Sequence, residues 1–583
     1  MEIDTDTRTD RGAGAEQPCG WLARAEASAW DLAPDDRRLL ALLDELVADR
    51  RAAGVRDPVV LVVTDRPDER LALLVDADLV EPSAVGASEL RLRLATGARP
   101  DLVVLDTADL RRRRALLLPL AFVVPRGGAL LVARSRLGVT DAAESTMRQV
   151  TGLLEPTADE PAAPGVRAME LPHIAAGWRD VRLAGDHLVL RNALRSLVTL
   201  AEREADVALR RSPERGRVLA TLPGGRFEPR GTLNESDSPA AGRWRTAYDV
   251  PDLSLRRYVE VVCRPGGVVT QGHVLLPESH RHIARRRPNN RFAPTVSSTA
   301  ARLRRRVPVA RDLEEPHFFW DSEFRGHFGH VMTEMLSRLW ALDEARRHHP
   351  GLRILMATSP NKEADLTAHE VAVLAAFGVV PEEITFLREP ARVRTLLAAT
   401  PMFSQPEVVH PEIAAVWDRL GDHLAGQAPD RLDGRPYPRR IFVSRRGGLR
   451  ACRNAAEVEA LFAGAGFAVV HPEAHRMAVQ ARLFREADVI AGYAGSGLFN
   501  AMLADTPKRL VMISSETYTV QNEWMIAAVR GHHVDVAWSR PDRLDRPDVG
   551  EARSPARPGT LHAPYSVDPE REGLFLRKVL AEL

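Results

Sequence analysis

Two stretches of sequence decide the fold of this chain. The first reads Ile441-Phe442-Val443-Ser444-Arg445-Arg446-Gly447-Gly448, and the second reads Val489-Ile490-Ala491-Gly492-Tyr493-Ala494-Gly495-Ser496-Gly497. Each is an apolar run with the length of a buried strand, and each ends in a loop suited to an anion. Because ligands of open α/β sheets bind at the carboxyl ends of strands, the two stretches together predict a diphosphate site.

The residue types in these loops favour phosphate. Gly492, Gly495 and Gly497 let the backbone turn sharply and approach a ligand without a Cβ in the way. The residues that follow, 498–503, predict a helix whose unpaired N–H groups and dipole attract an anion. Arginines after the first strand add planar, permanently charged forks. Either loop alone is more often an ordinary turn, but the two together favour a site.

Further motifs stand in order on both sides of these loops. They are Gln271 to Ser279; Phe328-Gly329-His330 with Glu334; Ser444-Arg445-Arg446; Arg453-Asn454 with Glu457; Gly466 to Val470 with Pro472-Glu473; Gln480 and Phe484; Gly492, Gly495 and Asn500; and Asn522-Glu523-Trp524. This series, over roughly residues 250–538, resembles the family 61 glycosyltransferases. It departs from the family pattern at Ala494, where the family has a histidine, and at Glu457, an acid displaced from the position directly after the helix-start Asn.

The resemblance implies a glycosyltransferase of the bacterial capsular or exopolysaccharide type. Such an enzyme would be inverting and metal-independent, and would move a hexosyl or pentosyl group from a nucleotide diphosphate donor, with UDP the expected nucleotide, to a glycan or lipid-linked glycan. The nucleotide sugar is a substrate, so no cofactor is expected. Two alternatives stay open: a catalytically reduced glycan-binding or scaffold protein, motivated by Ala494, and a bifunctional methyltransferase–glycosyltransferase.

The resemblance also assigns residues to the donor. Those expected to bind the diphosphate and its surroundings are Arg445, Arg446, Arg453, Asn454, Gly492, Gly495, Ser496, Gly497 and Asn500. Glu473 and Glu523 are expected to hold ribose or sugar hydroxyls.

A base for the acceptor hydroxyl is expected at the start of a helix over residues 329–348. His330 and Glu334 lie at i and i+4 and share one face, so Glu334 could orient the imidazole. Asp321 is a further candidate. The alternative is that His330 packs the helix start and Glu334 faces solvent. His327, His330 and Glu334 could instead converge on a metal, but the H-E-x-x-H order is absent and no metal is expected.

The length of 583 residues predicts about three domains. We expect an α/β chain: a GT-B type pair of Rossmann-like lobes preceded by an additional Rossmann-like domain. The predicted boundaries are 1–155 for the N-terminal domain, 156–170 for a linker, 171–435 for the acceptor-side lobe and 436–583 for the nucleotide-sugar lobe with a C-terminal helix.

The N-terminal domain shows three buried strands, 59–65, 101–106 and 129–133, which predict a parallel sheet. Asp65 and Asp106 end the first two and could contact a ligand. The layout is similar to a methyltransferase domain, but no glycine loop follows the first strand, which favours a degenerate scaffold. Further on, strands are expected at 352–356 and 383–387, helices at 367–377 and 568–583, and a loop at 224–240.

Composition excludes several classes of protein. There are 80 basic and 79 acidic residues, so no global field for nucleic acid is expected, although 282–306 is locally basic. Three widely spaced cysteines form no disulfide or zinc pattern and favour a reducing cytosol. No apolar run approaches the roughly 18 residues of a membrane span, so membrane contact would be peripheral at most. A homo-oligomer is possible.

Overall fold

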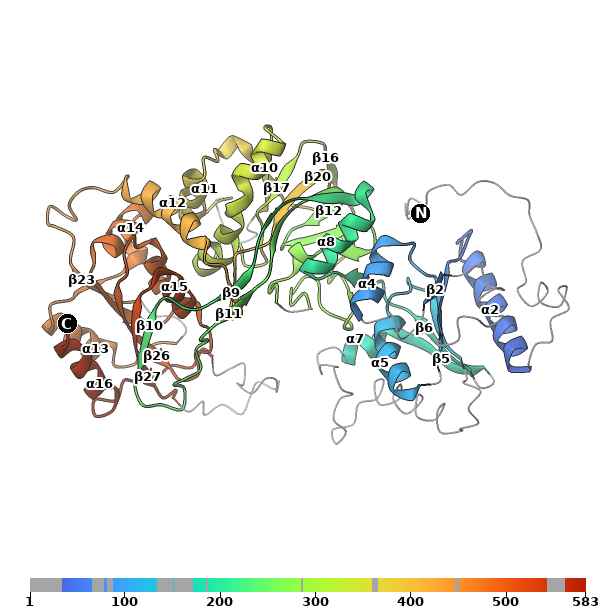
Figure 1. Cartoon of the computed structure of the whole chain (residues 1–583), viewed down its shortest axis with the longest axis horizontal. Coiled ribbons are helices and arrows are strands. Elements are labelled where there is room, and N and C mark those ends of the chain that lie inside the picture. Colours follow the sequence, from blue (N-terminus) through green and yellow to red (C-terminus); the bar gives the residue numbers. More distant parts are fainter. Residues whose placement is uncertain are drawn as a thin grey trace. The chain divides into compact units, whose positions relative to one another are not determined.

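The computed structural model describes residues 34–64, 78–80, 87–107, 109–133, 150, 171–184, 187–284, 287–358, 365–445, 450–542 and 561–583. These form two compact units (Figure 1). Unit 1 comprises Met1–Val218, Arg257–Glu314 and Glu389–Thr395, and unit 2 comprises Leu219–Arg256, Glu315–Arg388 and Leu396–Leu583. The acceptor-side lobe predicted over residues 171–435 is therefore divided between the two units. The expected α/β class is confirmed.

Unit 1 begins with a six-stranded sheet in the order β2-β1-β3-β4-β6-β5. Its strands and helices are β1 (Val60–Thr64), β2 (Asp78–Val80), β3 (Leu102–Asp106), β4 (Ala129–Val132), β5 (Trp178–Ala184), β6 (His187–Asn192), α2 (Pro34–Ala52), α4 (Ala87–Thr96), α5 (Leu110–Ala121) and α7 (Leu171–Gly177). Strands β2, β1, β3 and β4 are parallel, which confirms the three predicted strands. Leucines of α2 cover one face and leucines of α4 and α5 the other, so the sheet is buried on both sides.

A buried ion pair between Arg91 and Glu204 links α4 to the next helix, α8, which spans Glu202–Arg211. Arg91 donates to both carboxylate oxygens of Glu204 over 2.8 and 2.5 Å, and their side chains are 2% and 8% exposed. Burial alone would raise the pKa of Glu204, but hydrogen bonds from Arg91 and from the backbone N–H of Ala201 lower it below its usual value. The pair depends on both partners, because either charge alone would be buried without compensation.

Replacing Arg91 with Met should destabilise the chain by about 3–5 kcal/mol, because Glu204 is left buried without its cation. Urea unfolding measures this change. Arg93→Met on the same helix is the control: its side chain is 49% exposed and lies 3.8 Å from Glu89, so the loss should be below about 1 kcal/mol. Adding Glu204→Gln to Arg91→Met should restore part of the stability. Equal losses for Arg91→Met and Arg93→Met would contradict this account.

The remaining elements of unit 1 are short strands and turns. They are β7 (Leu197–Thr199), β13 (Val268–Gln271), β14 (Val274–Leu275), β15 (Ala300–Ala301), β16 (Arg311–Leu313), η1 (Pro213–Arg215) and η2 (Pro277–Ser279). Strands β8 (Gly216–Leu222), β12 (Leu253–Arg264) and β20 (Ala391–Ala399) have residues in both units.

Unit 2 contains four parallel strands of an 11-stranded sheet and, as a second sheet, a six-stranded one whose pairs are all parallel. In the first, β17 (His317–Phe319) pairs with the second half of β20 and with β18 (Arg353–Ala357), which pairs with β19 (Ile384–Leu387). The predicted strands at 352–356 and 383–387 are thereby confirmed. Helix α11 (Ala368–Ala376) is confirmed as well, and Thr367 caps it by accepting a hydrogen bond from the Glu370 backbone N–H. Short elements complete this part: η5 (Pro381–Glu383), β21 (Phe403–Ser404) and β22 (Val408–Val409).

The second sheet of unit 2 has the order β10-β27-β26-β25-β23-β24. Its elements are β10 (Thr232–Glu235), β23 (Arg440–Val443), α13 (Ala455–Gly464), β24 (Ala468–Val470), η6 (Pro472–Ala474), α14 (Met477–Glu486), β25 (Val489–Tyr493), η7 (Ser496–Leu503), β26 (Arg509–Ser515), α15 (Asn522–Arg530), β27 (His533–Ser539) and α16 (Glu572–Ala581). All pairs are parallel. Taken in chain order from β23, the strand order is 2-1-3-4-5, the flavodoxin-like arrangement of a doubly wound sheet.

Helices cover both faces of this second sheet. Figure 1 shows α13 and the expected C-terminal helix α16 together on one side of the orange-to-red strands, and their apolar residues share one core with Phe442. On the other side, α14 and α15 pack against η7. Helix α12 (Ile413–Ala425) contacts η7 and α14 of this sheet and also α11 of the first, so it ties the two sheets of unit 2 together.

Strand β10 corrects the expectation of a loop over residues 224–240. Thr232 to Glu235 pairs in parallel with His533 to Val536 and adds an edge strand to the second sheet. A two-stranded ribbon of β9 (Gly225–Phe227) and β11 (Tyr248–Val250) flanks it. The sequence hides β10 because an edge strand with partly exposed side chains needs no apolar run.

The helix predicted over 329–348 is present but is not a regular α-helix. It consists of α9 (Phe328–His330), a π-helical turn η3 (Val331–Met335), a 3₁₀ segment η4 (Leu336–Ala341) and α10 (Leu342–His348). Residues on several sides of it are buried, including Met332, Thr333 and Leu336. Periodicity could not predict the π turn, which depends on packing around the whole helix. Such turns are frequent at functional sites.

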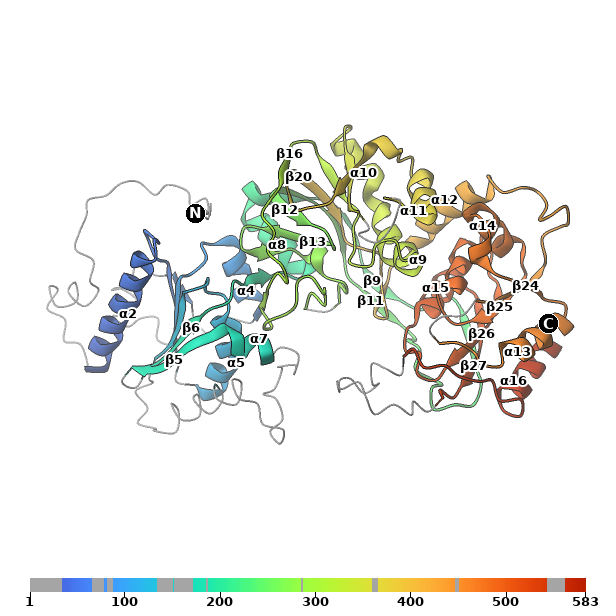
Figure 2. The same ribbon diagram turned by 180° about the vertical axis from the view of Figure 1, so that it is seen from behind.

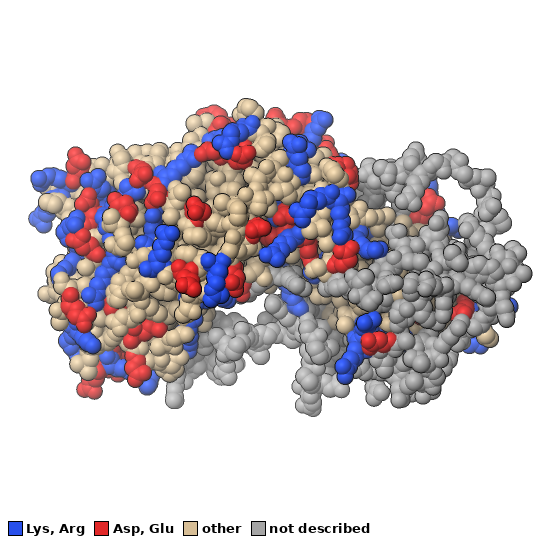
Figure 3. All heavy atoms as spheres, in the orientation of Figure 1, with Lys and Arg blue, Asp and Glu red and all other residues tan. Residues whose placement is uncertain are grey.

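The charged surface is mixed. Basic and acidic side chains are interspersed on the face shown in Figure 3, in keeping with the balanced composition. Among the described residues, no helix combines the length and the apolar character that a membrane span needs.

Candidate functional site

The candidate site lies in unit 2, where the strand order of the second sheet reverses. Strand β23 pairs with β25 on one side and β24 on the other, and Val443 is in register with Gly492. Residues that follow β23 and β25 therefore leave the sheet side by side. Open α/β sheets bind ligands in the crevice at this switch point. Arg445 follows β23 and Gly495 follows β25, so the described residues of both predicted loops lie there. Figure 2 shows β24 and β25 of this sheet from behind.

Two of the loop glycines allow close packing. A Cβ on Gly492 would lie 2.5 Å from the carbonyl oxygen of Val443, and one on Gly497 would lie 3.1 Å from Val443 Cγ1. Both residues let β25 and η7 approach β23 more closely than any side chain would permit.

Gly495 has a different role. Its φ of +142° is a conformation that residues with a side chain rarely adopt. A Cβ there would lie 2.7 Å from Arg445 Nη2 and 3.2 Å from Arg450 Nη2. The termini of two guanidinium groups therefore converge on the space that a side chain at Gly495 would fill. The guanidinium termini thus occupy the place of that side chain, and two adjacent cations favour an anion.

Protein groups hold both guanidinium groups in place. Arg445 donates to the carbonyl oxygens of Ala494 and Tyr493, the latter over 3.5 Å. Burial, and then the nearby Arg450, lower the pKa of Arg445. The Arg450 guanidinium lies over the Tyr518 ring at 4.6 Å, and Arg450 has a positive φ of 61°. Left-handed backbone at a non-glycine residue is unusual and clusters at functional sites.

Glu523 closes the cluster from α15. Its carboxylate accepts a hydrogen bond from the Gly495 backbone N–H at 2.6 Å and from the Tyr518 hydroxyl at 3.2 Å. The side chain is buried, and burial raises its pKa to about 7, although Arg450 and the Gly495 N–H act in the opposite direction. Glu523 was expected to hold sugar hydroxyls. In the structure it binds the glycine loop itself.

The raised pKa has a consequence for stability. Between the ordinary value of 4.5 and about 7, the folded chain keeps a proton on Glu523 that the unfolded chain has released. The folded state therefore loses the stability that this group contributes as the pH rises through that window. Above the window, the folded chain must keep an ionised carboxylate buried, which costs free energy. The adjacent guanidinium groups of Arg445 and Arg450 offset part of this cost.

The helix after the glycine loop differs from the expected one. η7 is a 3₁₀ helix of eight residues, and the N–H of its N-cap, Gly495, is already bound to Glu523. The positive end of the helix is thus partly neutralised by a carboxylate of the protein. An incoming phosphate would share that end with Glu523.

The second part of the site is the His330–Glu334 pair. Nδ1 of His330 lies 2.9 Å from Oε1 of Glu334, and the two side chains are 19% and 13% exposed. The His330 ring stacks on Phe324 with centroids 4.4 Å apart and meets the edge of His327 at 5.0 Å. A carboxylate at Nδ1 places the proton on that nitrogen and leaves the lone pair on Nε2. The structure therefore contains the expected contact by which Glu334 orients the His330 ring.

The His330–Glu334 pair and the glycine loop are neighbours. A Cβ on Gly329 would lie 3.2 Å from Ser496 Cβ and 3.3 Å from Phe499 Cε2, so α9 packs directly against the start of η7. Asp321 is buried beyond the end of β17, next to Trp320, whose indole N–H donates to the carbonyl of Met335 at 2.8 Å. These contacts bring both predicted halves of the site together within unit 2.

Other predicted donor residues lie outside this cluster or act as internal ties. Arg453 is exposed and pairs with Asp542. Asn454 donates to the carbonyl of Val567, and its oxygen accepts from the Val567 N–H. Asn500 is fully buried and donates to Gln480, and Glu473 is exposed beside His471. Arg446 lies outside the described residues.

The structure adds residues that the motif series did not assign. Arg450, Tyr518 and Tyr565 surround Arg445 and Glu523, and burial raises the pKa of both tyrosines. The one sequence signal that could have identified Arg450 as a site residue is its position after a glycine-rich loop. Among the described residues, no group of three or more His, Cys, Asp or Glu side chains is arranged to hold a metal ion.

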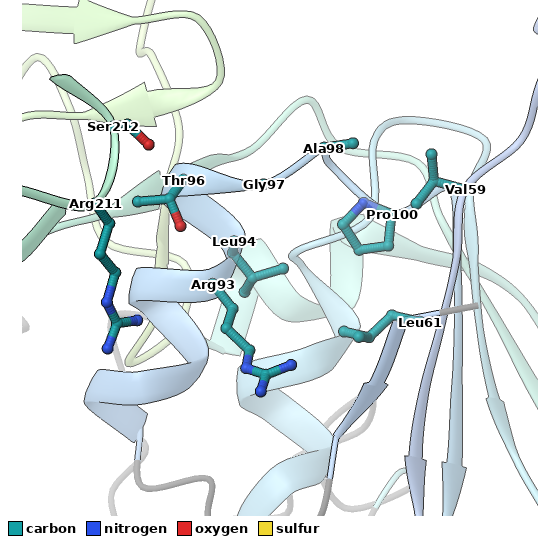
Figure 4. A pocket seen from close by; sticks show the side chains of 10 residues that line it. All are labelled: Val59, Leu61, Arg93, Leu94, Thr96, Gly97, Ala98, Pro100, Arg211 and Ser212. Carbon is teal, nitrogen blue, oxygen red and sulfur yellow. The ribbon is translucent and has the colours of Figure 1, made fainter. Parts of the chain in front are cut away.

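The strands of the N-terminal sheet end differently from those of the C-terminal sheet. Thr64 donates to Asp106 at 3.2 Å, which joins the carboxyl ends of β1 and β3; Asp65 lies outside the described residues. A cavity of about 270 Å³ lies at the opposite, amino ends of these strands (Figure 4). Its lining includes Val59, Pro100 and Arg93. Cofactors of open α/β sheets bind at the carboxyl ends, so this cavity does not favour a methyltransferase site.

Comparison with known proteins agrees with the geometry. The family model described as "Glycosyltransferase 61" matches residues 328–511. That range contains His330, Glu334, Arg445 and Gly495, and the match confirms the resemblance over these residues. No curated protein sequence matches the chain.

A solved structure similar to this chain is that of TibC, a bacterial iron-containing dodecameric glycosyltransferase from enterotoxigenic E. coli H10407. The identity is 14%, the match covers 47% of this chain and 78% of that one, and the TM-score is 0.18. A likeness of that size carries no argument about fold or activity.

Gly495→Ala should abolish or greatly weaken nucleotide diphosphate binding, by at least about tenfold in Kd, because the new Cβ displaces Arg445 and strains the backbone. Titration calorimetry with UDP measures the affinity. Gly464→Ala is the matched control, since nothing lies within 4 Å of a Cβ there. Unchanged UDP binding by Gly495→Ala would show that binding does not depend on the position of Arg445.

Proposed function

We propose that this protein is an inverting glycosyltransferase of GT-B type that uses a nucleotide diphosphate sugar, with UDP the expected nucleotide. The acceptor would be a glycan or lipid-linked glycan in capsular or exopolysaccharide synthesis. The carrying observation is the convergence of Arg445 and Arg450 on Gly495 at the switch point of a doubly wound sheet. The family match over residues 328–511 supports the same reaction class.

The arginine pair suits the leaving group. When the bond between the anomeric carbon and the diphosphate breaks, its electron pair goes to the diphosphate oxygen. Fixed positive charge beside that oxygen stabilises the transition state more than the ground state. Arg445 and Arg450 would supply this charge without a metal ion, and the start of η7 would add its dipole. The proposed reaction therefore proceeds in the presence of a chelator.

His330 supplies the base in this proposal. Its Nε2 would take the proton of the acceptor hydroxyl while that oxygen attacks the anomeric carbon from the side opposite the diphosphate. One displacement of this kind inverts the configuration. Glu334, bound to Nδ1, would hold the ring and stabilise the imidazolium that forms. Asp321 stays a further candidate for this role.

Arg445→Ala and Arg450→Ala should each weaken UDP binding by about 10–100-fold, since a hydrogen bond to a charged group contributes about 1.5–3 kcal/mol. Titration calorimetry measures the loss. Arg439→Ala is the control: this arginine precedes β23 at the other end of the strand, is 62% exposed and pairs with Asp488. Its UDP affinity should stay within about twofold. Normal UDP affinity in both the Arg445→Ala and Arg450→Ala variants would refute the proposed diphosphate-binding site.

His330→Ala should lower kcat by about 10²–10⁴-fold while UDP affinity stays unchanged, because the base acts on the acceptor and not on the diphosphate. Release of UDP from a donor sugar, with and without acceptor, measures kcat. His348→Ala is a matched control from the same helix, since His348 also contacts a glutamate at i,i+4 spacing, Glu344 at 3.1 Å, and is more exposed. A full-rate His330→Ala enzyme would exclude His330 as the base.

A second candidate function is glycan binding by a protein that has lost transfer. Ala494 motivates it, because this position lacks the histidine that the resembling family carries. In the structure the Ala494 carbonyl accepts from Arg445, so the backbone at this position is still part of the cluster. The two functions differ in one measurement: a binding protein releases no UDP from any of a panel of UDP sugars, whereas the transferase does.

A further inference from the structure

Glu523 is the buried carboxylate of the described cluster, and the proposed transfer step gives it no direct role. It occupies the N–H of Gly495, the group at the helix start that a phosphate would approach. An acid in this place opposes an anionic ligand if it is ionised and accommodates one if it is protonated.

We propose that Glu523 is a positioning residue that takes up one proton when a nucleotide diphosphate binds beside Arg445 and Arg450. The inference rests on the proposed function, since it needs a diphosphate ligand. The inference adds a regulatory property to the proposed function, because donor affinity would depend on the protonation of a residue that does not touch the reacting atoms.

The balance of charge favours a protonated Glu523 in the complex. In the protein without ligand, Arg445 and Arg450 contribute two positive charges next to one carboxylate. A diphosphate adds at least two negative charges to the same place. With Glu523 ionised, the total becomes negative around a buried carboxylate, and like charges at short range in a protein interior repel strongly. Protonation of Glu523 removes that repulsion.

Glu523 can form hydrogen bonds in both of its protonation states. Ionised Glu523 can accept from both Gly495 N–H and Tyr518 O–H. Protonated Glu523 has an O–H to donate, so it can remain in place while the loop N–H turns to a phosphate oxygen. Tyr518 stays protonated throughout, because burial raises its pKa. The carboxyl group therefore has a role in both states.

The other groups that face this carboxylate do not compete for the proton. Arg445, which follows β23, and Arg450, which precedes α13, carry permanently charged guanidinium groups. Tyr565 keeps its proton because burial raises its pKa. Burial, and then Arg450, lower the pKa of the nearby His562. Glu523, whose pKa burial raises to about 7, is the group of this set closest to exchanging a proton near neutral pH.

The sign follows from linkage. A bound diphosphate raises the pKa of Glu523 further, so the complex holds a proton at pH values where the free protein has lost it. Uptake is small near pH 6, where the free protein is already protonated, and rises towards one proton near pH 8. The Kd for UDP should then increase by up to about tenfold per pH unit above pH 7.

The test is calorimetric titration of the full chain with UDP at pH 8 in buffers of different ionisation enthalpy. At this pH the UDP phosphates are already ionised, so the dependence of the heat on the buffer reports protons taken up by the protein. We expect close to one proton for the unmodified chain and close to none for Glu523→Gln. Glu382→Gln, an exposed glutamate on η5, is the control and should keep the uptake.

The outcomes separate the two proposals. No UDP binding at any pH refutes the donor site and this inference with it. Binding without proton uptake, or uptake that persists in Glu523→Gln, overturns the inference and leaves the donor site standing. Should Glu523→Gln fail to fold, the pH dependence of Kd in the unmodified chain decides: a Kd constant between pH 7 and pH 9 contradicts the inference.

Discussion

The candidate site depends on the missing side chain of Gly495. Arg445 Nη2 and Arg450 Nη2 would lie within 2.7 and 3.2 Å of a Cβ at this position, so any larger residue would displace them. Because the backbone has a positive φ there, Gly495 also turns the chain from β25 into η7. The positions of the two cations, the direction of the loop and the start of η7 therefore all depend on this one residue. Two guanidinium groups at such short range repel each other, and the nearby Glu523 carboxylate offsets part of that repulsion.

Irregular helix geometry brings the proposed base to the same place. The segment from Phe328 to His348 passes from α to π to 3₁₀ hydrogen bonding while most of its sides are buried. Gly329 permits contact with Ser496, and His330 follows directly. Glu334 orients the imidazole in the π turn. The position of His330 is thus set by packing of α9 on η7 and not by the helix on its own.

The two doubly wound sheets of the chain show why strand order alone does not make a site. Both have a switch point between their first and third strands. In the C-terminal sheet, arginine follows β23 and supplies charge, and glycine follows β25 and allows close approach of the loops. In the N-terminal sheet Thr64 and Asp106 bind each other across the strand ends, and no glycine follows β1 in the sequence. The difference lies in the residues after the strands, and it supports a structural role for the N-terminal sheet.

The sequence by itself predicted the strands at 59–65, 101–106, 129–133, 352–356 and 383–387, a parallel N-terminal sheet and the strands before the two loops. Buried apolar runs and glycine–arginine loops are local signals, so they can be read without the fold. It also singled out His330, Glu334 and Glu523 as candidates, whose roles stay predictions. Tertiary structure alone decided that Arg450 joins Arg445, that β10 completes the sheet and that Asn454 and Asn500 serve as internal ties. It also decided that Glu523 binds the loop N–H rather than an open cleft. These outcomes depend on contacts between residues far apart in the chain, and local sequence patterns carry no information about which distant side chain fills a given space.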